Sequence, residues 1–184
     1  MQSSYLTSAI RQFAYYKMLG EKAMEQVPDE ALFWQYNEES NSIAIIVNHM
    51  AGNMLSRFTG FLTSDGEKPW RNRDAEFENS FSDRAQLMAR WNEGWACLMQ
   101  ALNELSEADL ERLVYIRNDG HTVTEAINRQ LAHYAYHAGQ IVFIAKMIRN
   151  THWQTLSIAR NRSSDYNQRK FSREKGKRHF TDDL

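Results

Sequence analysis

The sequence has little cysteine, proline or glycine, and each shortage narrows the class of protein. A single cysteine, Cys97, excludes an internal disulfide and a cysteine-rich zinc site. Two prolines and eight glycines in 184 residues favour long helices over the many tight turns of an all-β fold. No apolar run approaches the roughly 20 residues that cross a bilayer, and residues 1–13 lack a basic start followed by an apolar stretch. We therefore expect a mostly helical, cytoplasmic protein without a membrane segment.

The charge is distributed unevenly although the net charge is only −1. Residues 160–184 carry eight Lys or Arg and four Asp or Glu, whereas residues 1–159 carry 14 basic and 19 acidic residues. Lys and Arg contacts to phosphate supply most non-specific affinity for nucleic acid, so an acidic body is poorly suited to that partner. We expect one domain over 1–159 and a basic, partly flexible C-terminal arm over 160–184. Contact of the arm with DNA stays open as an alternative.

Four long segments have apolar residues in helical spacing, and side chains that commonly cap helices stand near their starts. The predicted helices span about 3–26, 40–62, 82–105 and 122–150, and the candidate caps are Ser3 or Ser4, Ser40 or Asn41, Ser82, and Thr122 with Glu125 in a capping box. Residues 63–80 contain turn signals and form a long connection, and residues 113–120 form an extended piece closed by a turn. The sequence thus predicts an all-α four-helix bundle with a long crossover between its second and third helices.

Two histidines stand four residues apart in the fourth predicted helix, where His133 and His137 share one face beside its apolar stripe. Neutral imidazole is a good ligand for zinc, nickel and iron, and a catalytic zinc site uses three protein ligands with one position open. His49 is the best third ligand, because it alone of the remaining histidines lies inside a predicted helix. It lies off the centre of its own stripe, but small Gly52 and Ser56 beside it would let a neighbouring helix approach closely.

A simpler interpretation of the histidines stands beside the metal site. An i,i+4 pair arises by chance in many helices, and a lone buried histidine is commonly a hydrogen-bonded core residue. The intervening residues, Tyr134, Ala135 and Tyr136, include no glutamate, so the motif is weaker than HExxH, which carries its own general base.

The segments NHMAGNM around His49 and TVTEAINRQLAHYAYHAGQI resemble the DinB/YfiT-like metalloenzyme family. More narrowly, SIAIIVNHMAGNMLSRFTGFLTSDGEKPWRNRDAEF and HWQTLSIARNRSSDYNQ resemble an uncharacterised DinB-like subfamily, a domain of unknown function, over about residues 5–167. The resemblance implies an up-down-down-up four-helix bundle whose parallel second and third helices require the long crossover. It also implies a divalent ion on His49, His133 and His137, nickel or zinc, with iron or manganese as alternatives.

Relatives in that family include a mycothiol-dependent isomerase and bacillithiol-type transferases, so the resemblance extends to a low-molecular-weight thiol as second cofactor. A metal ion deprotonates a coordinating thiol and so provides a nucleophile at neutral pH. We expect a metal-dependent enzyme of the thiol S-transferase or hydrolase type that acts on a small-molecule substrate. The alternative is a non-catalytic stress-response protein in which the same pocket holds a metal or ligand.

Further residues have both a functional and a structural interpretation. Asn53, Arg57 and Gln130 could orient a ligand at the histidines or merely pack between helices. Cys97 is expected in the core. A group of crossover residues, most of them charged, could form a lid over an anionic substrate, but a solvated ion-pair network is favoured. The group consists of Asp65, Glu67, Lys68, Trp70, Arg71, Arg73 and Asp74. A second apolar stripe on the fourth predicted helix consists of Tyr136, Phe143 and Met147. It predicts either a homodimer interface or a surface that the C-terminal arm covers.

Overall fold

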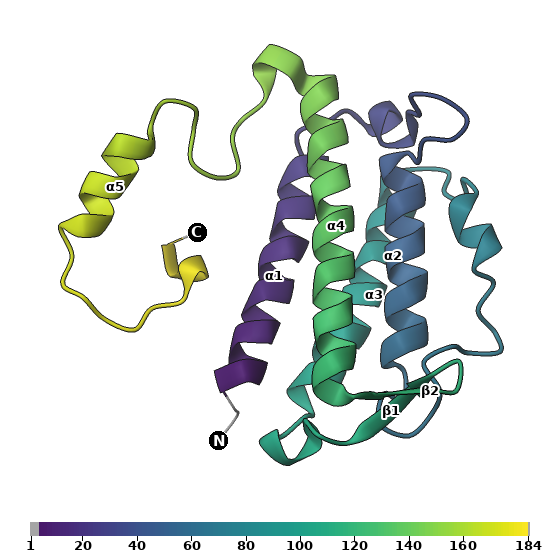
Figure 1. Ribbon diagram of the computed structural model, residues 1–184. Helices are drawn as coiled ribbons and strands as arrows, with labels where there is room; N and C mark the ends of the chain where they lie inside the picture. The colour runs from purple at the N-terminus through teal and green to yellow at the C-terminus, as the bar shows by residue number, and fades with distance from the viewer. Residues whose placement is uncertain (1–3, 184) are drawn as a thin grey trace.

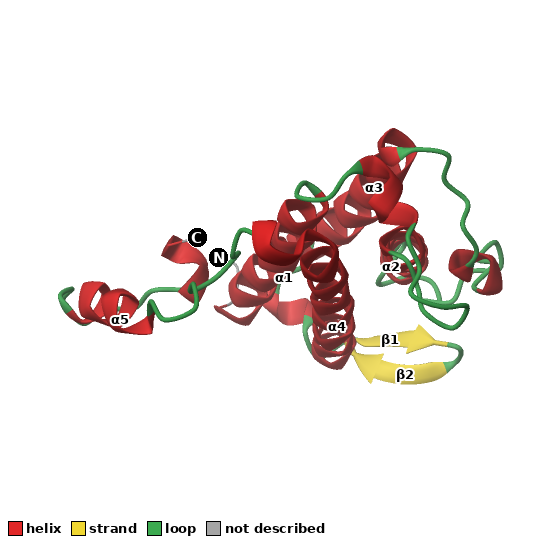
Figure 2. Ribbon diagram, turned by 90° about the horizontal axis from the view of Figure 1, so that it is seen from above, coloured by secondary structure: helices red, strands yellow, loops and turns green. Residues whose placement is uncertain are grey.

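The computed structural model describes residues 4–183, which are mostly helical with one small two-stranded sheet (Figures 1 and 2). The helices are α1 (Ser4–Met24), α2 (Ile43–Phe58), α3 (Arg84–Asn103), α4 (Val123–Arg149) and α5 (Ser163–Phe171). The strands are β1 (Leu113–Ile116) and β2 (Asp119–Thr122), paired antiparallel. Helices α1 to α4 lie side by side, and α5 stands apart from them in the C-terminal arm.

The helices begin close to the predicted capping residues. The predicted capping box is present at α4, where the Thr122 hydroxyl accepts from the backbone N–H of Glu125 and the Glu125 carboxylate accepts from that of Thr122. The caps of α2 and α3 are Ser42 and Asp83, which differ from the predicted residues by one or two positions. Ser4 begins α1, while Ser3 lies outside the described residues.

Helix α2 is shorter than predicted and ends at Phe58 instead of Leu62. The next residues form a turn in which Gly60 adopts φ 57°, a conformation that glycine accepts without a steric penalty. All residues of α2 except Leu55 are buried. The helix therefore lies at the centre of the structure, which explains why it is apolar on nearly every face.

The core lies between α1, α2, α3 and α4 and contains several large aromatic side chains that are almost fully buried. Trp95 of α3 packs edge-on against Phe13 of α1 and Tyr134 of α4, with ring centroids 6.5 and 5.9 Å apart. Gly94 faces Ala51 of α2 so closely that a Cβ on residue 94 would lie 2.8 Å from the Ala51 Cα. These contacts hold the histidine-bearing helices α2 and α4 at fixed positions.

The crossover from α2 to α3 is fixed to the β1–β2 hairpin. The extended piece predicted at residues 113–120 is confirmed as β1 and the start of this hairpin. Arg117 and Asn118 form its turn with φ of 55° and 64°, and the Asp65 carboxylate accepts from both of their backbone N–H groups at 2.9 Å. Hydrogen bonds from the backbone N–H groups of Asn118, Glu67 and Arg117 lower the pKa of Asp65 to about 2. The crossover is thus anchored at its beginning, before it passes over α2.

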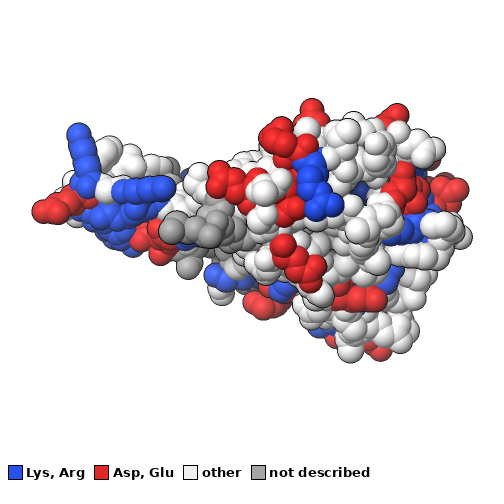
Figure 3. Space-filling view, turned by 90° about the horizontal axis from the view of Figure 1, so that it is seen from below, with Lys and Arg blue, Asp and Glu red and all other residues white. Residues whose placement is uncertain are grey.

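The C-terminal arm leaves α4 and returns to α1. Phe180 packs edge-on against Tyr15 with ring centroids 5.3 Å apart, and Asp182 pairs with Arg11. Viewed from below, Lys and Arg gather on this arm, while Asp and Glu are scattered over the helical body (Figure 3). Among the residues that the structure describes, no helix combines the length and apolar character needed to span a membrane.

Candidate metal centre

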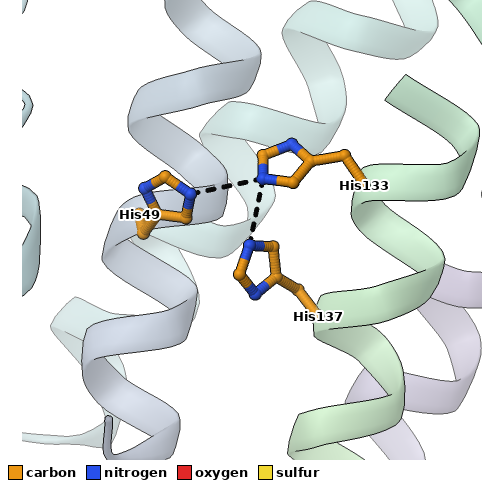
Figure 4. A group of neighbouring side chains, drawn as sticks. All are labelled: His49, His133 and His137. Atoms are coloured by element: carbon orange, nitrogen blue, oxygen red, sulfur yellow. Dashed lines mark hydrogen bonds between the residues drawn. The ribbon is translucent and has the colours of Figure 1, made fainter. Parts of the chain in front are cut away.

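The three predicted histidines come together between α2 and α4 (Figure 4). The Nε2 atom of His133 lies 3.3 Å from that of His49 and 3.0 Å from that of His137. One ligand nitrogen from each residue lies within 4.8 Å of the other two. Nitrogens bound to one ion at about 2.0–2.1 Å lie roughly 2.8–3.0 Å apart in octahedral and roughly 3.3–3.4 Å apart in tetrahedral geometry, so this cluster could hold a metal ion.

The other ring nitrogen of each histidine faces an oxygen. Nδ1 of His49 lies 2.9 Å from Glu76 Oε2, and Nδ1 of His137 lies 2.7 Å from Gln140 Oε1. Nδ1 of His133 lies 3.4 Å from the side-chain oxygen of Gln130. If each Nδ1 carries the proton, the three Nε2 lone pairs face one another without a proton between them. A cation at that point relieves their repulsion, and this tautomer is the one that metal-binding histidines adopt.

Burial keeps two of the imidazoles in the neutral, metal-binding form. Burial, together with the neighbouring imidazoles, lowers the pKa of His133 to about 3 and that of His137 to about 4; the neighbours are His137 and His49 for the first and His49 for the second. The hydrogen bond to Gln140 raises the pKa of His137 and offsets part of this effect. Both side chains are therefore neutral at pH 7 and keep a lone pair for a metal.

Glu76 is the acidic partner of the cluster and was not among the predicted site residues. Only 7% of its side chain is exposed, and Arg71 donates to its two oxygens at 2.7 and 2.9 Å. Burial would raise the pKa of Glu76, but the hydrogen bonds from Arg71 and His49 outweigh this effect and leave it lowered. The ionised carboxylate can thus accept from Nδ1 of His49, as carboxylates do beside metal-binding histidines.

The sequence predicted that Gly52 and Ser56 let a neighbouring helix approach α2 closely. The element that approaches is the crossover, which includes a short 3-10 helix. A Cβ on Gly52 would lie 2.3 Å from Glu76 Oε1, so only glycine leaves room for that carboxylate. The Ser56 hydroxyl donates to the carbonyl of Gly66 at 2.7 Å and accepts from the backbone N–H of Lys68 at 3.2 Å. Both small residues therefore bring the crossover onto the helix that carries His49.

A short 3-10 helix in the crossover, η2 (Asp74–Phe77), covers the cluster. It supplies Glu76, and its Phe77 ring stacks on the His49 ring with centroids 4.7 Å apart and planes at 30°. The guanidinium group of Arg73 lies over the Phe77 ring, with its Cζ 5.0 Å from the ring centroid. The crossover thus contributes directly to the surroundings of His49.

The three predicted pocket residues all lie near the histidines. Asn53 accepts a hydrogen bond of 2.8 Å from the Tyr134 hydroxyl in the core. Arg57 is buried and donates to the Gly66 carbonyl and to Glu67. Both residues line a cavity of about 300 Å³ together with Gln130, His49 and His133. Asn53 and Arg57 therefore pack against neighbouring groups and also line the cavity, and their role in orienting a ligand stays a prediction.

The charged residues of the crossover form the expected ion-pair network, although part of it is buried. Glu67 Oε2 accepts from Arg57, Arg71 and Arg117 at 3.0 to 3.3 Å. Lys68 donates to the backbone carbonyl of Asp65. Trp70 is 58% exposed, Asp74 is exposed, and Cys97 is half-buried at the edge of the core. Sequence reasoning placed the network in the crossover but had no signal to separate Glu76 from the other acidic residues.

The fold and the cluster define a mostly helical protein in which three histidines lie close enough to hold a metal ion. A family model described as "Protein of unknown function (DUF1572)" matches residues 1–162, and the chain belongs to this family. The match includes all three histidines and the whole crossover. No curated protein and no solved structure matches the chain.

Proposed function

We propose that this protein binds one divalent metal ion through His49, His133 and His137, and that it is a metal-dependent enzyme of the thiol S-transferase or hydrolase type. The observation that carries the proposal is the convergence of three Nε2 atoms whose Nδ1 atoms all face oxygens. Nickel and zinc suit three neutral imidazoles, and iron or manganese are the alternatives.

A bound divalent ion would supply Lewis-acid chemistry and lower the pKa of a coordinating thiol or water. The protein's own residues would hold the imidazoles in position and limit the access of solvent. Glu76 and Gln140 keep the Nδ1 protons of His49 and His137, and Phe77 covers one face of the His49 ring. The adjoining cavity provides the space for a small-molecule substrate.

Metal analysis of protein purified without an affinity tag tests the proposal. We expect about one nickel or zinc ion per chain, and a higher melting temperature when the ion is restored after chelation. His137→Ala should lose the ion and the stabilisation, whereas His152→Ala should keep both, because His152 is exposed beyond α4. Absence of stoichiometric metal, together with no stabilisation by either ion, would exclude the metal site.

We also propose that the family is related to the DinB/YfiT-like metalloenzymes. The direction of the helices supports this proposal. In Figure 1, α1 and α4 run upward, while α2 and α3 run downward and are joined by the long crossover. That is the up-down-down-up order of the four-helix bundle expected for the relatives. A mycothiol- or bacillithiol-type thiol is the corresponding second cofactor.

The second candidate function is a non-catalytic stress-response protein that holds a metal or ligand in the same cavity. The two candidates differ in turnover. A panel of low-molecular-weight thiols tested against electrophiles, with simple esters for hydrolysis, should give a product whose formation disappears in His137→Ala if the protein is an enzyme. Metal binding without turnover of any pair favours the non-catalytic function.

A homodimer and a cytoplasmic location remain part of the proposal. The stripe of α4 that supports a dimer is exposed by 62% at Tyr136, 64% at Phe143 and 46% at Met147. Trp34 and Tyr36 line the same groove and extend its apolar surface. The arm does not cover this stripe in its described contacts, which go to α1 instead. A second copy of the chain is thus the proposed cover.

A further inference from the structure

We propose that the cavity beside the histidines binds the oxyanion group, carboxylate or phosphate, of a small-molecule substrate. The inference rests on the proposed function, because it names the substrate class for the same site. It starts from the composition of the cavity of about 300 Å³ that His49 and His133 line. Five of the nine residues that line it are arginines, and none is acidic.

The five arginines reach the cavity from four separate segments. Arg57 comes from α2, Arg71 and Arg73 from the crossover, Arg117 from the hairpin turn and Arg129 from α4. Residues 1–159 as a whole carry more acidic than basic side chains. The positive charge gathered at this cavity is therefore opposite in sign to the net charge of residues 1–159.

The carboxylates in contact with these arginines do not balance their charge. Glu67 accepts from Arg57, Arg71 and Arg117, and Arg71 is the one arginine of the five that also donates to Glu76. Two negative charges thus face five positive ones. A divalent ion on the histidines would increase the excess. Bringing like charges together is unfavourable, and an anionic ligand would offset that cost.

Two of the arginines have no carboxylate partner among the ion pairs of the described residues. Arg73 contacts the face of Phe77, and Arg129 is exposed on α4 one turn before His133. Their guanidinium groups remain available for the bidentate contacts that arginine makes with carboxylate and phosphate. The three paired arginines, in contrast, are held in place by Glu67 and by the Gly66 carbonyl.

The position of the cavity beside the histidine cluster determines how a ligand bound in it would be oriented. His49 and His133 belong both to its lining and to the three-histidine cluster. An oxyanion held by the arginines would place the remainder of a small molecule against the converging Nε2 atoms. The volume lies at the lower end of the range of small-molecule sites, which favours a metabolite-sized acid over a polymer.

Isothermal titration calorimetry at constant ionic strength tests the inference with two probes, sodium phosphate and succinate. Each probe is titrated into the protein as purified and into the protein after chelation. We expect saturable binding of at least one probe, weakened about tenfold in Arg129→Gln and in Arg73→Gln, because each loses a charge-assisted contact. Lys146→Gln is the matched control; it removes one positive charge from an exposed position of α4 outside the cavity and should bind like the wild type.

The outcomes separate this inference from the proposed function. Anion binding that persists after chelation supports the inference whatever the metal content. A protein that holds a metal on its histidines but binds neither probe overturns the inference and leaves the metal site standing. Equal weakening in Arg129→Gln and Lys146→Gln would also overturn it, since the effect would then reflect net charge alone. The relative affinities of phosphate and succinate distinguish the two oxyanions.

Discussion

Glu76 is the residue on which the orientation of His49 depends most directly. Its carboxylate lies between Arg71 and His49, and Gly52 leaves the space that it occupies. Since both partners are almost fully buried, the charge of Glu76 is compensated by hydrogen bonds instead of water. We infer that Glu76 is a positioning residue, which acts through His49 and does not itself contact the ion.

Glu76→Gln should weaken metal binding about 10–100-fold, because a carboxylate that accepts from Nδ1 of a metal-binding histidine fixes the ring and raises the basicity of Nε2. Competition with a chelator of known affinity measures the change. Glu67→Gln is the matched control, because Glu67 pairs with three arginines, including Arg71, but contacts none of the three histidines. Equal metal affinity in the two variants would show that Glu76 has no specific role in holding His49.

At the scale of elements, the position of His49 follows from the packing of α2 against α3. Gly94 allows the two helix backbones to approach, and Ala51 fills the space opposite it. On the other side, the crossover lies on α2 through Ser56 and Gly52. Helix α2 is therefore fixed from both sides, and its histidine cannot move independently of the core.

Gly94→Ala should destabilise the protein by about 1–3 kcal/mol, because the added methyl group would meet the Ala51 backbone and the helices would have to separate. Urea denaturation measures the free energy of unfolding. Gly139→Ala is the control within α4, where a Cβ would meet nothing within 4 Å; it should stabilise by about 0.5–1 kcal/mol through the helical preference of alanine. Two variants of equal stability would contradict the proposed close contact.

For the whole molecule, the buried His137 and the half-buried His133 make the stability of the metal-free protein depend on pH. Burial lowers the pKa of His133 to about 3 and that of His137 to about 4, from an ordinary value of 6.5. Above pH 6.5 the folded and unfolded chains both hold neutral imidazoles. Below it the unfolded chain takes up protons that the folded chain does not, so stability decreases from pH 6.5 towards pH 4.

His133→Gln should reduce this loss of stability, measured in the metal-free protein as the fall in melting temperature between pH 7.5 and pH 5. The variant removes one of the two imidazoles that take up a proton when the chain unfolds below pH 6.5. His152→Gln, at an exposed position, should lose as much stability as the wild type over the same interval. A fall that is as large in His133→Gln as in the wild type would contradict the prediction.

From the sequence alone, the helices and the three candidate ligands could be predicted. Apolar spacing and capping chemistry act within a few turns of helix, so the segments of α1 to α4 and the capping box at Thr122 could be predicted. The pairing of His133 with His137 follows from helix geometry alone. His49 was predicted as the third ligand because it alone of the remaining histidines lies inside a predicted helix, although it lies off the centre of its apolar stripe. The resemblance to known metalloenzymes implies the same residue.

The surroundings of the histidines depend on how distant parts of the chain pack together. Glu76 and Phe77 are 27 and 28 residues from His49 in sequence, and no local pattern distinguishes them from other residues of an irregular connection. The five arginines of the cavity come from four segments, so no local pattern indicates that they lie together. Helical periodicity reports contacts along one element, whereas charge compensation and cavity lining depend on how distant elements pack.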